Sequence, residues 1–176
     1  MKELYLFMRE EQYRQNLADT LHSLGYQVHI PVKEKIETSY YYSNHLCIVD
    51  SWFFKRCKTH FPYAILFTKT VGEDEIQLIQ THSCTGFICP IYNERTLQAV
   101  IEIALMKQKQ FQQIEKDNRK LTRKLQDRRI IEKAKYILVK RGRISEEEAY
   151  ERMRTEAMNQ QKTLRQVADL ILINEE

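Results

Sequence analysis

Residues 96–141 form a stretch of 46 residues that contains no proline and no glycine. It consists largely of Lys, Gln, Glu, Leu and Arg, which are strong helix formers. The stretch therefore predicts one continuous helix, which would span roughly 70 Å at about 1.5 Å per residue. At 176 residues, the chain has room for one large domain, or for a domain of about 100 residues plus an appendage.

Apolar side chains recur along this predicted helix with the seven-residue period of a coiled coil. With Phe111 at position a, the positions Ile114 and Leu121 are d, and Asn118 and Leu125 are a. An asparagine at an a position fixes the register and favours two parallel strands. We therefore expect residues 97–127 to form a coiled coil that joins two chains into a parallel homodimer. The alternative is a helix that packs within its own chain.

The formal net charge of +4 is distributed unevenly. Residues 1–106 carry 10 Lys and Arg against 12 Asp and Glu, residues 107–143 carry 14 against 4, and residues 144–176 carry 4 against 8. A long basic segment is either a solvated helix surface or a contact surface for a polyanion. Its position directly before the C-terminal residues favours the polyanion.

The first hundred residues alternate short apolar runs with helix-like stretches. The runs are residues 4–8, 28–30, 46–49, 64–67 and 86–89. Continuous apolar strands that alternate with helices predict an α/β domain with a parallel sheet covered on both faces. Gly25 fits the position after the first helix, where a positive φ is needed. We expect a weak helix at residues 40–44 and a short one within residues 51–60.

The last fifty residues predict three helices. The first continues the long helix and ends at Gly142. Ser145 with Glu148, and Thr163 with Gln166, have the spacing of capping boxes and mark the starts of the next two helices. Small side chains on the apolar stripes would let these short helices pack closely; they are Ala134, Ala149, Ala157 and Ala168.

Residues 1 to about 106 resemble the receiver domain of two-component response regulators, which has a flavodoxin-like fold. Four segments carry the resemblance: LHSLGYQV from Leu21, HLCIVD ending at Asp50, PYAILFT ending at Thr68, and GFICPIYNERTLQAVIEIAL from Gly86. The resemblance implies that residues 1–106 form a receiver-like domain.

The receiver resemblance places Asp50 at the phosphoacceptor position and Thr68 at the position of the active-site hydroxyl. The acidic pair that holds Mg²⁺ in active receivers falls on Met8 and Arg9, and the lysine of the family falls on Cys89. Mg²⁺ needs oxygen ligands, and phosphoryl transfer needs the metal and a positive group. We therefore expect a degenerate receiver that is not phosphorylated and holds no metal or cofactor.

A register slip offers an alternative, because Glu10 and Glu11 follow directly and could supply the missing carboxylates. Without a metal site formed in this way, the domain would serve as a scaffold, a dimerisation unit or a binding site for a regulatory protein or ligand.

Residues 125–173 resemble the ANTAR domain, the RNA-binding unit of bacterial transcription antiterminators. The matching pattern runs through three predicted helices: Arg129-x-x-Ile, Ala134-Lys135, Ser145-x-x-Glu-Ala-Tyr150, Arg154, Ala157-Met158 and Leu164-x-x-Val167-Ala168. The family commonly has Gly and Met where this chain has Tyr136 and Val139. A receiver-like domain joined through a coiled coil to an ANTAR domain is the layout of the amide- and nitrate-responsive antiterminators. We therefore expect an ANTAR domain at residues 128–176.

The ANTAR resemblance implies a regulator that binds hairpins in nascent leader mRNA and prevents a terminator from forming. Tyr150 and Arg154 lie at i and i+4, so one helix face could combine base stacking with a phosphate or base contact. The alternative for Tyr150 is a partly buried core position, and for each cation a solvated side chain. The candidate RNA-binding residues are Lys133, Lys135, Arg141, Tyr150, Arg154 and Arg165.

A DNA-binding or phosphorylation-switched response regulator is the alternative function. The acidic second helix and the net charge of −4 (4 minus 8) over residues 144–176 are a poor match for the phosphates that flank a DNA groove. No nucleophile–base pair, metal cluster or glycine-rich phosphate loop is recognisable, so we do not expect an enzyme. Four cysteines without a C-x-x-C pair, and no long apolar stretch, predict a cytoplasmic protein that does not bind membranes.

Overall fold

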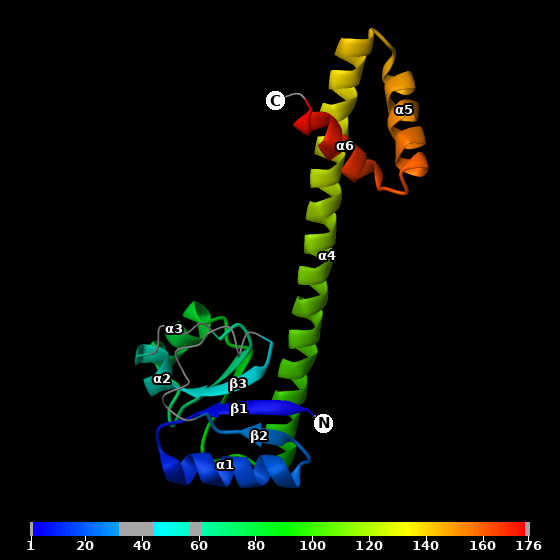
Figure 1. The fold of residues 1–176 in the computed structure, drawn as a ribbon. Helices are drawn as coiled ribbons and strands as arrows, with labels where there is room; N and C mark the ends of the chain where they lie inside the picture. The colour runs from blue at the N-terminus through cyan, green and yellow to red at the C-terminus, as the bar shows by residue number, and fades with distance from the viewer. Residues whose placement is uncertain (1, 32–43, 57–60, 175–176) are drawn as a thin grey trace. The chain divides into compact units, whose positions relative to one another are not determined.

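The computed structural model describes residues 2–31, 44–56 and 61–174 (Figure 1). The chain divides into two compact units, an N-terminal unit (Met1–Gln112) and a C-terminal unit (Gln113–Glu176). Helix α4 (Glu94–Gly142) contributes its first part to the N-terminal unit and the rest to the C-terminal unit. Among the described residues, no helix combines the length and the apolar character that crossing a membrane requires.

The N-terminal unit is built on a parallel sheet of five strands in the order β2-β1-β3-β4-β5. The register pairs Leu4 with Leu46 and Ile48 with Ile65. This confirms the α/β fold class and the parallel sheet expected from the apolar runs. The strands are β1 (Glu3–Phe7), β2 (Gln27–His29), β3 (Leu46–Asp50), β4 (Ala64–Phe67) and β5 (Gly86–Ile88).

Helices cover both faces of this sheet (Figure 1). Successive side chains of each strand point to opposite faces, so each strand contributes to two cores. Leu6, Ile48 and Ile65 lie in a core with α1 (Glu11–Ser23) and the first turns of α4. Phe7 and Leu66 lie in a second core with α2 (Ser51–Arg56) and α3 (Glu73–Thr81). Burial on both faces explains why the strands are continuously apolar.

Helix α1 ends as the sequence predicts. Gly25 has φ +84°, and its N–H donates to the His22 carbonyl at 2.9 Å. The next residue, Tyr26, donates to the Leu21 carbonyl at 3.0 Å, which completes a Schellman motif. The weak helix expected at residues 40–44 lies, apart from Asn44, outside the described residues. The short helix expected after β3 is α2, and residues 57–60 also lie outside the described part.

The C-terminal unit consists of the later turns of α4 with α5 (Glu146–Asn159) and α6 (Leu164–Ile173). The residues of its core cluster are mostly small, and they come from all three helices: Ala134, Met153, Ala157, Val167 and Ala168. Small side chains let the helix axes approach closely, so three short helices can share one core.

Both predicted capping boxes of the C-terminal unit are confirmed. The Glu148 N–H donates to Ser145 Oγ at 3.1 Å, and the Ser145 N–H donates to the Glu148 carboxylate at 2.9 Å. Thr163 and Gln166 make the equivalent pair at the start of α6. Helix α4 ends at Gly142 as expected, but the residue with a left-handed backbone is Arg143, with φ 49°.

Candidate nucleic-acid interface and the pocket of the N-terminal unit

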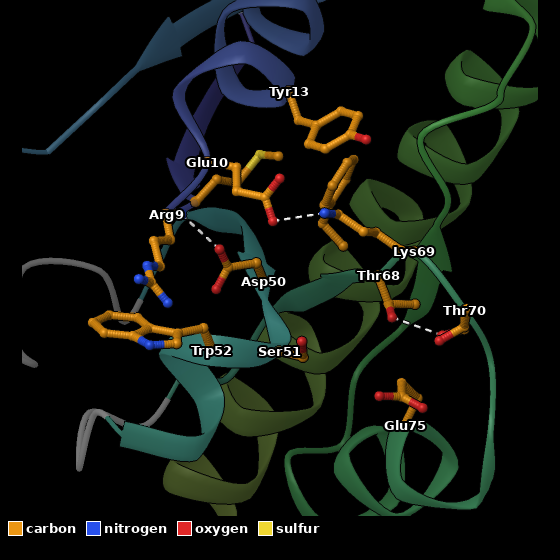
Figure 2. A pocket seen from close by; sticks show the side chains of 12 residues that line it. Arg9, Glu10, Tyr13, Asp50, Ser51, Trp52, Thr68, Lys69, Thr70 and Glu75 are labelled. Carbon is orange, nitrogen blue, oxygen red and sulfur yellow. Dashed lines mark hydrogen bonds and ion pairs between the residues drawn. The ribbon is translucent and has the colours of Figure 1, made fainter.

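A pocket of about 290 Å³ lies at the carboxyl edge of the sheet in the N-terminal unit (Figure 2). Arg9, Asp50 and Thr68 line it, and they follow or end β1, β3 and β4. These strands are neighbours in a parallel sheet, so their carboxyl ends meet at one edge. The structure therefore brings together Asp50 and Thr68, the two residues that the receiver resemblance singled out.

The Asp50 carboxylate accepts hydrogen bonds from two backbone N–H groups. The Arg9 N–H donates to Oδ2 at 2.6 Å, and the Phe53 N–H donates to Oδ1 at 2.8 Å. The second bond links Asp50 to the third residue of α2, which is the geometry of a helix N-cap. Asp50 thus ties the turn after β1 to the start of α2.

Lys69 is a residue of this pocket that the sequence analysis did not identify. Its Nζ lies 2.8 Å from Oε1 of Glu10 and 5.1 Å from the ring centroid of Tyr13. The hydrogen bond with Glu10 is the main cause that raises the pKa of Lys69 above its ordinary value. The sequence feature that could have identified Lys69 is its position directly after Thr68, at the end of β4.

Two further polar side chains of the pocket, Arg9 and Thr68, have partners within it. The Arg9 guanidinium lies 5.4 Å from the ring centroid of Trp52. The Thr68 hydroxyl donates to the Thr70 carbonyl at 2.7 Å. The acidic-pair positions are occupied by Met8 and Arg9, and neither side chain contains an oxygen. Met8 is also buried in the core. Over the described part of the chain, no group of three or more His, Cys, Asp or Glu could hold a metal.

Two of the candidate RNA-binding cations lie in ion pairs of the C-terminal unit. Lys135, with 15% of its side chain exposed, lies 2.7 Å from Glu132 and 2.9 Å from Glu146. These hydrogen bonds, with Glu132 first, raise the pKa of Lys135. The Glu146 contact joins α4 to α5, so Lys135 has a role within the fold.

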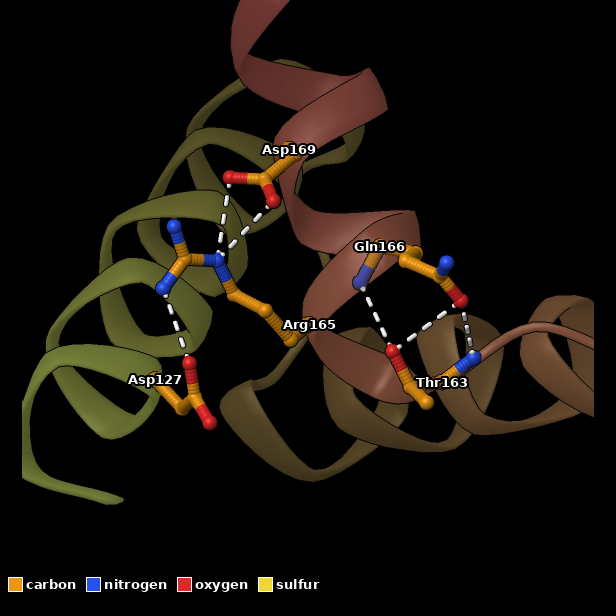
Figure 3. A network of polar contacts seen from close by, with 5 residues as sticks. All are labelled: Asp127, Thr163, Arg165, Gln166 and Asp169. Carbon is orange, nitrogen blue, oxygen red and sulfur yellow. Dashed lines mark hydrogen bonds and ion pairs between the residues drawn. The ribbon is translucent and has the colours of Figure 1, made fainter. Parts of the chain in front are cut away.

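Arg165 makes a similar link between α4 and α6 (Figure 3). Its Nη1 lies 2.9 Å from Asp127, and its Nε lies 2.9 Å from Asp169. The Asp169 hydrogen bond is the main cause that raises the pKa of Arg165. The guanidinium is one-third exposed, so part of its donor edge still faces solvent.

The remaining candidates lie at the surface of α4 and α5. Lys133 and Arg141 are exposed on α4. Tyr150 is 42% exposed, so it is partly buried and also accessible to a ligand. Arg154 is exposed on the same side of α5 and lies 3.4 Å from Glu151. Helix α5 also carries five glutamates against two arginines, so its surface is acidic overall.

The residues expected at the coiled-coil seam are exposed along α4. Phe111, Ile114, Leu121 and Leu125 each expose more than half of their surface, and Asn118 is exposed as well. A row of large apolar side chains on a helix is unfavourable in water unless another surface covers it.

Comparison with known proteins identifies the C-terminal region. The family model of the ANTAR domain matches residues 119–172. No curated protein sequence matches the chain.

Several solved structures are similar in fold. The response regulator StyR is 11% identical, with 97% of this chain and 98% of that chain covered and a TM-score of 0.57. Full-length FixJ from B. japonicum is 15% identical, with 98% of each chain covered and a TM-score of 0.50. A fusion that contains the trimeric coiled coil of yeast Spc42 is 16% identical, covers 71% of this chain and 96% of that chain, and has a TM-score of 0.50.

At these identities the structural likenesses establish the fold alone, whereas the family match identifies a domain. The receiver fold agrees with the order of the five strands and the helices on both faces of the sheet. The chain therefore contains an ANTAR domain at residues 119–172, and its N-terminal unit has the fold of receiver domains.

Proposed function

We propose that this protein is an RNA-binding regulator of transcription antitermination and not an enzyme. Its C-terminal unit would bind hairpins in nascent leader mRNA and so prevent a terminator hairpin from forming. The observation that carries this proposal is the ANTAR match over residues 119–172. The same region contains most of the basic segment, in which residues 107–143 carry 14 Lys and Arg against 4 Asp and Glu. Such an excess attracts the phosphates of RNA.

In this proposal, Lys133, Arg141, Tyr150 and Arg154 contact the RNA directly. A tyrosine and an arginine one turn apart can stack on an unpaired base and bind an adjacent phosphate. Lys135 and Arg165 contribute mainly by holding α5 and α6 against α4 through their ion pairs.

We also propose that two chains associate in parallel through Phe111, Ile114, Asn118, Leu121 and Leu125. Two ANTAR domains in one particle would match the two hairpins to which members of this family bind. Light scattering should then give the mass of a dimer for the wild type. Leu121→Asp should give a monomer, because a charge at a d position is costly to bury.

The RNA proposal is tested by gel shift with the full chain at fixed salt, because phosphate contacts depend steeply on ionic strength. A two-hairpin RNA should bind more tightly than duplex DNA of equal length. Tyr150→Ala and Arg154→Ala should each weaken RNA binding. Arg152→Ala is the matched control for Arg154→Ala, since Arg152 is exposed on the opposite side of α5 and its loss removes the same charge. Tighter binding of the duplex DNA would favour the DNA-binding alternative, and equal affinity for both would indicate non-specific contacts with phosphates.

We further propose that the N-terminal unit acts without phosphorylation of Asp50, as a scaffold or as the docking site of a regulatory protein. Both carboxylate oxygens of Asp50 accept backbone N–H groups, and Lys69 is paired with Glu10. The carboxylate at the phosphoacceptor position and the lysine of the pocket are therefore both engaged. Acetyl phosphate with Mg²⁺ should add no phosphate in intact-mass spectrometry. Stoichiometric addition that disappears in Asp50→Ala would instead establish a phosphorylation switch.

A further inference from the structure

One face of α4 in the C-terminal unit presents an exposed aromatic ring among three cations. Tyr136 is 62% exposed, and Lys140 Nζ lies 5.6 Å from its ring centroid. Arg129, Lys133, Tyr136 and Lys140 follow one another at spacings of four, three and four residues, which places them on the same side of the helix. We call these four residues the basic face. Ala134, which lies in the core, points to the other side.

Two grooves meet on this side of the C-terminal unit. Lys133, Tyr136 and Lys140 of α4 line the first together with Leu172 of α6. The second is lined mainly by basic and apolar side chains, among them Arg128, Arg129, Ile130, Lys133 and Arg165, together with the carboxylate of Glu132. Lys133 and Glu132 belong to both grooves, so the grooves adjoin. The surface therefore combines apolar area with positive charge, which suits nucleotides that have a flat base and a phosphate.

The charge of the basic face is not neutralised within the chain. Among the described residues, Arg129, Lys133 and Lys140 have no ion pair with an acidic side chain. The nearby Glu132 is held by Lys135 at 2.7 Å. Helix α5, by contrast, carries five glutamates and two arginines. Positive charge in the C-terminal unit is thus concentrated on α4.

We propose that Tyr136 is a stacking platform for an unpaired loop base of the RNA, with Lys133 and Lys140 on the flanking phosphates. This inference rests on the proposed RNA-binding function and names the surface that takes the loop. Loop bases splayed from a hairpin stack on aromatic rings, and a cation over the ring adds to the attraction. The ANTAR family commonly has glycine at this position, which offers no ring for stacking. Tyr136 would therefore contribute to the choice of RNA loop.

A second copy of the chain is a less suitable occupant of the basic face. A symmetric contact would bring Lys133 and Lys140 close to the same lysines of the other chain, and like charges repel. RNA instead supplies the opposite charge at regular intervals. Charge complementarity therefore favours the nucleic acid.

The test uses the full chain and a two-hairpin RNA, with intact loops or with abasic loop nucleotides. Tyr136→Ala should weaken binding of the intact RNA by about 5- to 150-fold, the range expected for the loss of one stacked base. On the abasic RNA, the wild type and Tyr136→Ala should bind alike. Tyr136→Phe keeps the ring and should stay within about twofold of the wild type. Lys140→Gln should lower the slope of log Kd against log salt by about 0.7 to 1.

The outcomes separate this inference from the function on which it rests. If the wild type does not bind two-hairpin RNA, the proposed function and the inference both fail. If the wild type binds and Tyr136→Ala binds equally well, only the inference is overturned. Light scattering provides a further check, because a loss of binding that accompanies a change of oligomeric state would assign Tyr136 to a contact between chains. A photoreactive phenylalanine analogue at position 136 should crosslink to the loop and not to the stem.

Discussion

The pocket of the N-terminal unit and the basic face of the C-terminal unit contain the same kinds of side chain, used in opposite ways. Each places a cation near an aromatic ring, Lys69 near Tyr13 in the pocket and Lys140 near Tyr136 on α4. In the pocket, however, Lys69 is also bound to Glu10, and Asp50 is bound to two backbone N–H groups. Residue type alone therefore does not make a binding site. What matters is whether partners within the chain already satisfy the charge.

The largest expected effect comes from removing the central carboxylate of the pocket. Asp50→Ala should lower the free energy of unfolding by about 2 kcal/mol, because α2 loses its cap and the Arg9 N–H loses its acceptor. Urea denaturation of the full chain measures this loss. Asp50→Asn should lose less, since the amide keeps one acceptor oxygen. RNA affinity should not change in either variant, and a parallel loss of affinity would break the contrast between the two regions.

The C-terminal unit should depend more on its helix caps, because its core is built mainly from small side chains. Ser145→Ala removes the acceptor for the Glu148 N–H and should destabilise this unit by about 1 kcal/mol. Thermal unfolding followed by circular dichroism gives the change. Ser145→Asp restores a good capping residue and serves as the control. If Ser145→Ala and Ser145→Asp had equal stability, the cap would not contribute.

A substitution at Arg143 should stabilise the protein, in contrast to those at Asp50 and Ser145. Its φ of 49° is unfavourable for a residue with a Cβ, whereas glycine adopts it readily. Arg143→Gly should therefore stabilise the C-terminal unit by about 0.5 to 1 kcal/mol. Arg143→Ala removes the same charge without relieving the backbone, so it separates the two effects. Equal melting temperatures for the alanine and glycine variants would contradict the prediction.

The smallest effect concerns a surface interaction of the N-terminal unit. Glu102 accepts hydrogen bonds from Lys2 at 2.5 Å and from the Tyr26 hydroxyl at 2.7 Å. The Lys2 contact, followed by the Tyr26 contact, lowers the pKa of Glu102. A carboxyl group with a lowered pKa in the folded state stabilises the protein above its ordinary pKa. This stability is lost as the pH falls through the lowered value.

Glu102→Gln should therefore cost at most about 1 kcal/mol at neutral pH, because the pair is partly exposed and screened by solvent. The variant and the wild type should converge in strong acid, where both lack the charge. Urea denaturation across the acidic pH range tests whether the difference in free energy of unfolding between the two proteins becomes smaller as the pH falls. A difference that grew as the pH fell would mean that the carboxylate is unfavourable in the folded state.

The sequence predicted the architecture well where the signal is local. Apolar runs located the strands, and the capping boxes at Ser145 and Thr163 were visible from residue type and spacing. Gly25 was predicted because glycine favours positive φ. The left-handed residues Ser83 and Gln161, which follow α3 and α5, were not predicted. Neither is glycine, so their conformation depends on the packing of the surrounding chain.

The candidate sites were predicted less completely, because they depend on pairs that are distant in the sequence. Asp50 and Thr68 were found from the resemblance to receiver domains. The Glu10–Lys69 pair was not, since it requires knowing that the ends of β1 and β4 lie at one edge. Arg165 was proposed as an RNA contact from its charge alone. Its bond to Asp127, 38 positions earlier, becomes visible only in the folded helices.

Trp52 gives the molecule a built-in optical signal. It is the only tryptophan of the chain, and its ring lies 5.4 Å from the Arg9 guanidinium and 5.0 Å from that of Arg56. The ten tyrosines absorb little at the red edge of the absorption band. Fluorescence excited there therefore comes from Trp52 and reports on the wall of the pocket. Small molecules that displace either guanidinium should change the emission, so ligands of this pocket can be screened without attaching a dye.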